Sequence, residues 1–257
     1  MKKDIVTFLY HEVSDDPNST GFVRNSSLPY KHGNDEFIDN IEAIKNTQIK
    51  PTTIKNINEH TLTHKILLTF DDGGKSAMHI ANILNKHNWK GHFLITTSLI
   101  GTKTFLSKLD IKELFQTGHI IGTHSHSHPT PFYKLSYDEM SKEWSISKDI
   151  LEQIIGEKII CGSIPGGDMD KKAIKSAKKN RIKFLFTSEP TNKIFIDEEI
   201  TIVGRVCPKA GTRISRIKDF ANNKGFLREK MIKKVKNILR FLLGPLYSYY
   251  VKTYHST

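Results

Sequence analysis

The sequence predicts an α/β fold in which seven strands alternate with helices. Short, apolar, β-branched segments recur between residues 5 and 206, and amphipathic segments with a period close to 3.6 residues fill most of the intervals. Strands that alternate with helices form βα units and a parallel sheet. Seven such units suit a (β/α) barrel better than an open sheet, and 257 residues are enough for one such domain.

The expected strands begin close to the first residue, after a short charged start. A polar stretch over residues 14–34, with two prolines and two glycines, is expected to form the loop after the first strand. The seven strands are expected at residues 5–9, 66–70, 93–96, 120–123, 159–162, 184–187 and 202–206.

The expected helices carry apolar residues at helical spacing. The segment 36–46 has Phe37, Ile41 and Ile44 on one side, and a second pattern covers 76–87. The longest pattern runs over 137–155 and is followed by Gly156, which is typical of a helix C-terminus.

The last 34 residues differ from the rest in charge. Residues 224–257 hold eight lysines and arginines against one acidic residue, which accounts for more than half of the chain's net charge of +12. Met231, Val235, Ile238 and Leu242 fall on one helical face, and Gly244-Pro245 would end the helix. We therefore expect two parts, a barrel over 1–223 and a basic amphipathic helical tail over 224–257.

Composition excludes several classes of protein. An apolar fraction of 37% with 9% aromatic residues argues against disorder, and two cysteines rule out both a disulfide-rich scaffold and a four-cysteine zinc site. The first residues lack the length and cleavage site of a signal peptide, and no apolar run approaches the length of a membrane span. A cytoplasmic location is therefore expected, with a peripheral position at the inner membrane face as an option.

Two adjacent carboxylates follow the second strand, where Asp71 and Asp72 enter a glycine turn. Neighbouring side chains point to opposite faces of a strand, but at its end they can diverge around one pocket. One carboxylate could then bind a metal while the other handles a proton. The simpler alternative is a turn with two solvated aspartates.

Three histidines at alternate positions follow the fourth strand: His124, His126 and His128. Neutral imidazole is a common zinc ligand, and Pro129 favours a tight turn over a regular helix at this point. The alternative is a solvated tract that binds metal weakly. Together with an aspartate, two histidines form a three-ligand site with an open position, which is typical of catalytic rather than structural zinc. Co²⁺, Fe²⁺ or Ni²⁺ would suit the same ligands.

The segments Thr69-Phe70-Asp71-Asp72-Gly73 and 124–128 resemble the first two motifs of the polysaccharide deacetylase (NodB-homology) family, and Tyr10-His11-Glu12-Val13 adds to the likeness. The resemblance covers about residues 5–220. It implies a distorted seven-stranded (β/α) barrel and a divalent metal, usually zinc. It also implies hydrolysis of an N-acetyl group on an amino sugar, with acetate released.

The resemblance also implies roles for individual residues. By motif position, Asp71 would be the general base towards a metal-bound water, and Asp72, His124 and His128 would bind the metal. His126 falls on a variable position and is expected to be a pocket wall that contacts substrate. The two serines of the second motif would hold its turn.

The third family motif is reduced here to Pro165 and Gly167. Ser163 stands where the family has an arginine that orients the base, and Gly166 replaces an aromatic residue. The Gly166 N–H can still contribute to an oxyanion hole, because that role needs no side chain. Pro165 is expected near the substrate, although a plain turn after a strand is the alternative.

The family's late histidine, the usual general acid, is absent from Ile202-Val203-Gly204-Arg205-Val206-Cys207. This segment, with Arg205, resembles a branch of the family in which an arginine appears at the last strand. It would contact the base or the substrate, or form a salt bridge that closes the barrel. His11 is a candidate for the missing acid by its location after the first strand.

We expect a metal-dependent carbohydrate N-deacetylase acting on a glycan or lipid-linked glycan. The alternatives are a deformylase or O-deacetylase on a related sugar, and an inactive barrel that keeps its metal and binds carbohydrate. The basic tail suits an anionic membrane surface, unless its apolar stripe packs on the barrel. No nucleic-acid-binding module is recognisable, so no specific nucleic-acid partner is expected.

Overall fold

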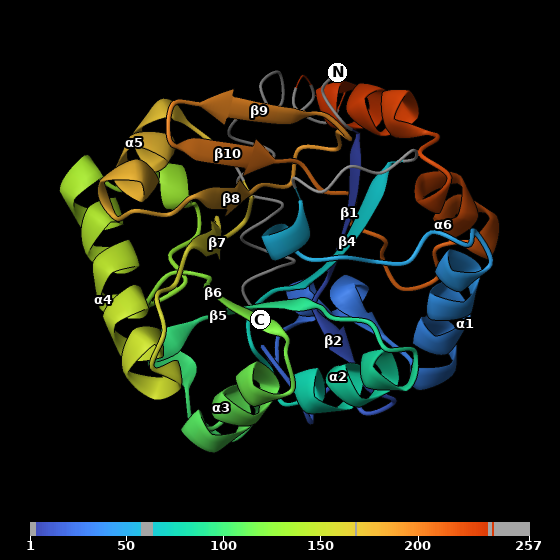
Figure 1. Ribbon diagram of the computed structural model, residues 1–257, viewed down its shortest axis with the longest axis horizontal. Helices are drawn as coiled ribbons and strands as arrows, with labels where there is room; N and C mark the ends of the chain where they lie inside the picture. Colours follow the sequence, from blue (N-terminus) through green and yellow to red (C-terminus); the bar gives the residue numbers. More distant parts are fainter. Residues whose placement is uncertain (1–3, 58–63, 168, 236–237, 239–257) are drawn as a thin grey trace.

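A computed structural model describes residues 4–57, 64–167, 169–235 and 238. Its main sheet has eight strands in the order β1-β4-β5-β6-β7-β8-β10-β9 (Figure 1). All neighbours are parallel except β9 and β10. The strands are β1 (Ile5–Tyr10), β4 (Lys65–Phe70), β5 (His92–Ile95), β6 (Ile120–Thr123), β7 (Cys161–Ser163), β8 (Phe184–Phe186), β9 (Ile194–Asp197) and β10 (Ile200–Val203).

The seven expected strands are all present, and they form the predicted parallel barrel. The sheet closes where β1 meets the segment after β10. The Leu9 N–H donates to the Val206 carbonyl at 2.8 Å, and the Val206 N–H donates to the Thr7 carbonyl at 2.9 Å. These two bonds form a single bridge between Phe8 and Val206, and no ladder joins β1 to β10 among the described residues, so the barrel is distorted. The antiparallel strand β9 was not predicted.

Helices surround the barrel (Figure 1). The long helix α4 begins with a capping box between Ser136 and Glu139 and ends at Gly156, whose φ of +77° is favourable for glycine. The predicted helices correspond to α1, α2 and α4, whereas α3, α5 and α6 were not predicted. The helices are α1 (Asn34–Lys45), α2 (Ser76–Lys86), α3 (Lys108–Gln116), α4 (Tyr137–Ile155), α5 (Lys171–Lys179) and α6 (Ile214–Ala221).

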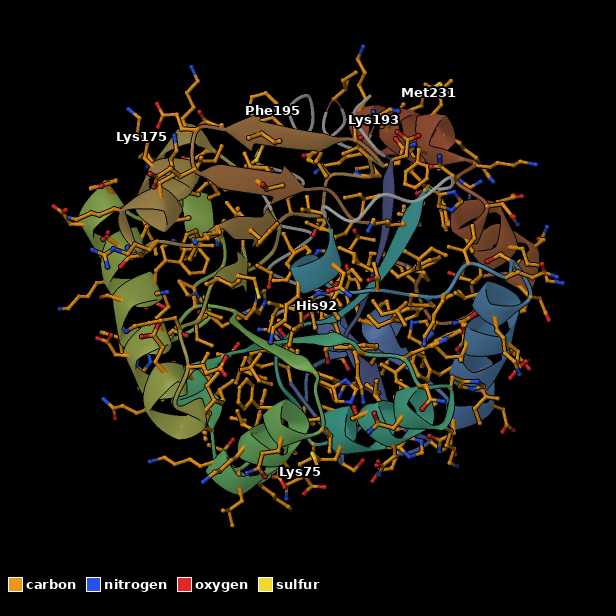
Figure 2. All side chains as sticks on the ribbon, in the orientation of Figure 1. Lys75, His92, Lys175, Lys193, Phe195 and Met231 are labelled. Atoms are coloured by element: carbon orange, nitrogen blue, oxygen red, sulfur yellow. The ribbon has the colours of Figure 1, made fainter. Side chains whose placement is uncertain are left out.

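Short elements complete the two ends of the barrel. The loop after β1 contains a small parallel pair, β2 (Glu12–Val13) with β3 (Lys31–His32), and the 3-10 turn η1 (Asn25–Tyr30). At the opposite end, η2 (Ile54–Asn56) donates the Ile54 N–H to Nε2 of His92, a buried residue in the barrel (Figure 2). Two further turns are η3 (Thr97–Leu99) and η4 (Phe132–Lys134).

The core has one apolar layer between the sheet and the helices and a separate apolar cluster inside the barrel. Which of the two a strand residue faces decides whether it can reach the site. On β4, Ile66, Leu68 and Phe70 belong to the apolar layer under the helices, whereas Leu67 belongs to a separate cluster with Leu94. Successive side chains on a strand point to opposite faces, so Asp71 continues the inward face of Leu67. The Asp71 N–H still donates to the Tyr10 carbonyl at 3.0 Å. A carboxylate is thus delivered to the interior at the strand's end.

The C-terminal tail is described only in part. Residues 226–235 are helical, and Phe226 packs against Phe220 of α6 with ring centroids 5.9 Å apart. The expected helix end at Gly244-Pro245 lies outside the described residues. No described helix is both long and apolar enough to cross a membrane.

Candidate active site

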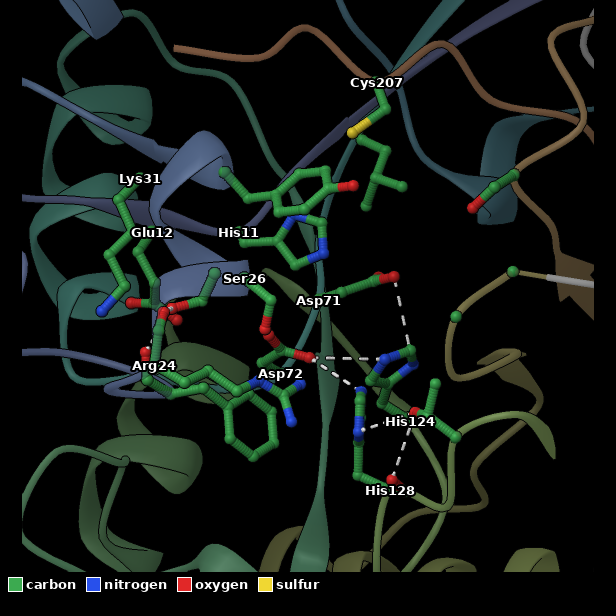
Figure 3. Close-up of a pocket in the computed structure, with 18 of the residues that line it drawn as sticks. His11, Glu12, Arg24, Ser26, Lys31, Asp71, Asp72, His124, His128 and Cys207 are labelled. Carbon is green, nitrogen blue, oxygen red and sulfur yellow. Dashed lines mark hydrogen bonds and ion pairs between the residues drawn. The ribbon is translucent and has the colours of Figure 1, made fainter. Parts of the chain in front are cut away.

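A cavity of about 270 Å³ opens at the carboxyl ends of the parallel strands (Figure 3). It receives side chains from the ends of β1, β4 and β6 and from the loop after β7. Predicted residues that line it are His11, Asp71, Asp72, His124, His128 and Gly166. Motifs that are far apart in the sequence therefore meet in one cavity, as expected for residues at the ends of parallel strands.

The two adjacent carboxylates diverge because the chain turns sharply between them. Asp72 has φ of +76°, an uncommon conformation for a residue other than glycine, and Gly73 follows at +84°. The next residue, Gly74, has no room for a side chain, because an added Cβ would lie 2.2 Å from Oε1 of Glu12. Asp71 therefore faces the barrel interior, while Asp72 turns towards the histidines (Figure 3).

The histidine segment folds into a tight turn, as Pro129 suggested. Ser125 and His128 have φ values of +66° and +56°, and the Ser125 Oγ accepts the His128 N–H at 3.1 Å. This turn brings the rings of His124 and His128 to 5.0 Å between centroids. Nε2 of each ring lies 3.4 Å from the same oxygen, Oδ1 of Asp72.

The spacing of these three groups fits a metal ion. Two ligands that bind zinc tetrahedrally at about 2.0–2.1 Å are themselves about 3.3 Å apart, close to the two measured distances. One ligand atom from each of Asp72, His124 and His128 lies within 4.8 Å of the others. The side chains of His124, His128 and Asp72 are only 3%, 10% and 11% exposed, which favours pairing or metal binding over solvation.

The ring of His124 is oriented by Ser163. Its Nδ1 lies 3.1 Å from the Ser163 carbonyl and 2.6 Å from the Ser163 Oγ. A proton on Nδ1 leaves the Nε2 lone pair free towards Asp72, the arrangement that metal-binding histidines adopt. The same Ser163 Oγ donates to Oδ1 of Asp71 at 3.2 Å. Ser163 therefore links His124 of the candidate metal site to the carboxylate of Asp71.

Asp71 forms a bidentate ion pair with Arg205. Nη1 and Nη2 of the guanidinium lie 2.7 and 2.8 Å from Oδ1 and Oδ2, and both residues are almost fully buried. Arg205 also donates to the Thr187 carbonyl at 3.0 Å and to Thr69 Oγ1 at 3.1 Å, so its fork is fixed. Of the roles open to Arg205, contact with the carboxylate of Asp71 is the one observed.

Burial and charge act in opposite directions on the carboxylates. Burial raises the pKa of Asp71, but the Arg205 guanidinium and His124 outweigh it and hold that pKa below its usual range. Burial likewise raises the pKa of Asp72, and hydrogen bonds with His124 and His128 hold it well below the usual value. Both carboxylates are therefore ionised at neutral pH.

His11 faces the same cavity without a hydrogen-bond partner on Nδ1 in the described part of the chain. Its ring lies 4.9 Å from the Tyr30 ring. Burial lowers the pKa of His11, and the charges of Asp72 and Asp71 offset part of that effect. The ring is therefore a partly buried imidazole close to both carboxylates (Figure 3).

Three predicted substrate contacts, His126, Pro165 and Arg205, are not among the residues that line the cavity. The His126 ring is held at Thr97, with Nδ1 3.0 Å from Oγ1, because alternate residues of the tight turn point in opposite directions. Pro165 lies within the turn between Ile164 and Gly167, and it is the neighbouring Gly166 that faces the cavity. His126 and Pro165 thus lie outside the described cavity wall, and their contact with substrate stays a prediction.

Residues of the loop after β1 form a wall that the sequence did not reveal. Phe22 lies against the His128 ring at 4.8 Å, and the Arg24 guanidinium lies 4.4 Å from the Phe22 centroid. Glu12 anchors this loop, because its buried carboxylate accepts hydrogen bonds from Thr20 and Ser76. A carboxylate directly after a buried strand was the only sequence signal for this anchor.

The fold and the cluster define a (β/α)-barrel protein with a candidate metal centre at the carboxyl ends of its strands. The family model described as polysaccharide deacetylase matches residues 57–185, which is half of the sequence. The chain belongs to the polysaccharide deacetylase family.

One curated protein is similar in sequence over part of the chain, and two solved structures share its fold. An uncharacterised 30.6 kDa protein of Geobacillus stearothermophilus is 29% identical over 130 residues, which is 48% of this chain and 46% of that protein. The match thus spans about half the length of the relative. A polysaccharide deacetylase from Bacillus cereus superposes with a TM-score of 0.72 at 21% identity, over 86% of this chain and 69% of that one. IcaB from Ammonifex degensii superposes with a TM-score of 0.71 at 18% identity, over 86% of this chain and 97% of that one.

Proposed function

We propose that this protein is a metal-dependent hydrolase that removes an N-acetyl group from an amino sugar. The observation that carries the proposal is the buried, ionised Asp71 beside the Asp72–His124–His128 cluster. A binding site would have no use for a second carboxylate held ionised by a dedicated arginine. Membership of the polysaccharide deacetylase family supports the same reaction class.

Each group in the cavity has a role that its position supports. Asp72, His124 and His128 would hold a divalent cation, with zinc the best match to two imidazoles and a carboxylate. That cation would supply a Lewis acid and lower the pKa of water at the site. Asp71 would accept the proton of the attacking water, and Arg205 would position it and keep it ionised.

Other residues of the cavity wall would stabilise the oxyanion and protonate the leaving group. The Gly166 backbone has φ of +70° and faces the cavity, where its N–H can donate to a developing oxyanion. His11 is the proposed proton donor to the leaving amine, because it is the remaining titratable ring in the described cavity wall without a partner on one nitrogen. The His11 ring would receive the proton that Asp71 takes from the water and pass it to the leaving amine.

The test is acetate release from short N-acetylglucosamine oligomers by metal-loaded protein. Asp71→Asn and His124→Ala should each lower kcat/KM by about 10³-fold or more, since both remove a group required in the transition state. Asp149→Asn and His79→Ala make the same changes at exposed positions and should leave kcat/KM unchanged.

Two outcomes would overturn the proposal. One is a folded, chelator-free protein that binds no divalent metal. The other is undiminished acetate release by Asp71→Asn. Release of formate from N-formyl sugars, with no acetate from N-acetyl sugars, would change the proposed acyl group from acetyl to formyl and leave the proposed site unchanged.

A further inference from the structure

The helical tail is docked on the barrel by its more polar side. Phe226 is buried against α6, Glu229 pairs with Arg216 at 2.7 Å, and Lys233 pairs with Glu189 at 2.5 Å. These three tail positions recur every three to four residues, so they define the inward face of the helix.

The apolar stripe of the tail points away from the barrel. Leu227 is 72% exposed, Met231 and Val235 are each 54% exposed, and Ile238 is 47% exposed. Their spacing of four, four and three residues places them on one face. A helix that packed only for the stability of its own domain would turn this face inward. The structure thus decides against packing of the stripe on the described part of the barrel.

Cationic side chains flank the exposed stripe. Arg228, Lys230 and Lys234 are exposed, and none of them forms an ion pair with a described carboxylate. The sequence beyond residue 238 adds Arg240 and Lys252, and no acidic residue. An apolar stripe bordered by unpaired cations is complementary to a surface that is apolar inside and anionic at its boundary.

A neighbouring strand exposes further apolar side chains. Phe195 and Ile196 of β9 are 60% and 55% exposed. Phe195 and Met231 lie along the same edge of the molecule in Figure 2, and Lys193 lies between them in that view. The exposed apolar surface of the tail therefore continues onto the barrel at this edge, where Lys193 pairs with Asp4.

A groove connects this edge with the candidate active site. A second cavity, of about 510 Å³, shares Tyr30, Gly166, Ser188, Cys207 and Lys209 with the wall of the first. Its other wall includes Ile232 and Lys233 of the tail helix. The helix that exposes the apolar stripe thus also borders a groove that adjoins the catalytic cavity.

We propose that the tail helix docks on an anionic phospholipid surface. Leu227, Met231, Val235 and Ile238 enter the interface, and Arg228, Lys230 and Lys234 meet the headgroups. Docking places the open groove at the level of the headgroups. If the proposed deacetylase function holds, on which this second step rests, the preferred substrate is an N-acetylated sugar carried on a membrane lipid.

Vesicle co-sedimentation of the full chain tests the docking. We expect binding to phosphatidylcholine vesicles that contain phosphatidylglycerol, little binding to phosphatidylcholine alone, and release by salt. Met231→Ser with Val235→Ser should weaken binding about tenfold or more, because both changes remove inserted apolar area. Leu109→Ser is the matched control, since Leu109 is 79% exposed on α3, on the opposite edge in Figure 1.

Several results would overturn the docking. Absence of vesicle binding by the intact chain, equal binding by the double variant, or equal binding to neutral vesicles would each do so. A concentration-dependent dimer in lipid-free solution, abolished by the double variant, would assign the stripe to a second copy of the chain.

Vesicle binding needs neither metal nor turnover, so its outcome is independent of the proposed hydrolysis. A kinetic comparison tests the second step. The double variant should keep wild-type acetate release from soluble oligomers and lose it selectively from an N-acetylated glycolipid in vesicles. Equal losses on both substrates would contradict the placement of the groove.

Discussion

At the scale of single residues, the pairing of Asp71 with Arg205 is the most informative contact. The third family motif lacks its arginine, and Ser163 occupies that position with only a weak hydrogen bond to Asp71 at 3.2 Å. The guanidinium arrives instead from the end of β10, 134 positions away in the sequence. A buried carboxylate still receives its cation, but from the other side of the barrel.

Replacement of Arg205 should change the ionisation of Asp71. Arg205→Met leaves a buried carboxylate unpaired, which costs about 3–5 kcal/mol and raises the pKa of Asp71. In the proposed mechanism Asp71 acts in its ionised form, so the acid limb of the kcat/KM profile should move to higher pH. Arg205→Lys keeps the charge and should give an intermediate shift. An unmoved acid limb in Arg205→Met would show that Arg205 serves only the structure.

The histidine motif contains its own control for metal binding. His124→Ala removes a candidate ligand and should weaken Zn²⁺ binding by more than the roughly 10- to 100-fold that loss of an outer-shell partner costs. His126→Ala, two residues away, removes a ring that is held at Thr97 and should leave the affinity unchanged. Competition with a chromogenic chelator measures both. Equal affinities for the two variants would contradict the proposed ligand set.

At the scale of elements, Glu12 joins the loop after β1 to the start of α2. Its carboxylate accepts a hydrogen bond from the Ser76 Oγ at 2.5 Å. The Ser76 N–H in turn donates to the Thr20 Oγ1 at 2.8 Å. Burial raises the pKa of Glu12 to about 7, although the hydrogen bonds from Ser76 and Thr20 lower it in part. The anchor of the cavity wall therefore titrates close to neutral pH.

The raised pKa of Glu12 predicts a loss of stability as pH rises. The unfolded carboxyl releases its proton near pH 4.5 and the folded one near pH 7, so the unfolded state binds fewer protons between these values. The free energy of unfolding should fall by roughly 3 kcal/mol across this window. Glu12→Gln should lack this fall in urea unfolding, and the exposed Glu157→Gln should retain it. Parallel pH curves for all three proteins would contradict the prediction.

Elements differed in how much the sequence revealed of them. The seven barrel strands are apolar runs that end in turns, and this local pattern is enough to find them. Helix α5 buries Ala173, Ser176 and Ala177, so its inward face lacks the large apolar residues on which a helical period depends. Strand β9 exposes Phe195 and Ile196 and has no alternation of buried and exposed positions. Strand β9 forms through its antiparallel pairing with β10, a contact that no local pattern indicates.

At the scale of the whole molecule, the same contrast applies to the site. A site of one aspartate and two histidines was predicted from residues that follow strands, and the resemblance to the family's first two motifs assigned it to Asp72, His124 and His128. The partner of Asp71 and the orientation of His126 depend on the closed barrel and on the turn around the histidines. The two-part organisation and the cytoplasmic location stay predictions.

The seam at Val206 has a consequence for the order in which the molecule becomes complete. Every candidate metal ligand lies before residue 129, in strands and turns that emerge early during synthesis. Arg205 comes from the last strand of the barrel and immediately precedes Val206, whose two hydrogen bonds close the seam. The full candidate ligand set thus precedes, along the chain, the residue that supplies the counter-charge of Asp71. On the proposed function, in which Asp71 is the base, closure of the seam would therefore ready the base, and competence for hydrolysis would wait until the fold is finished.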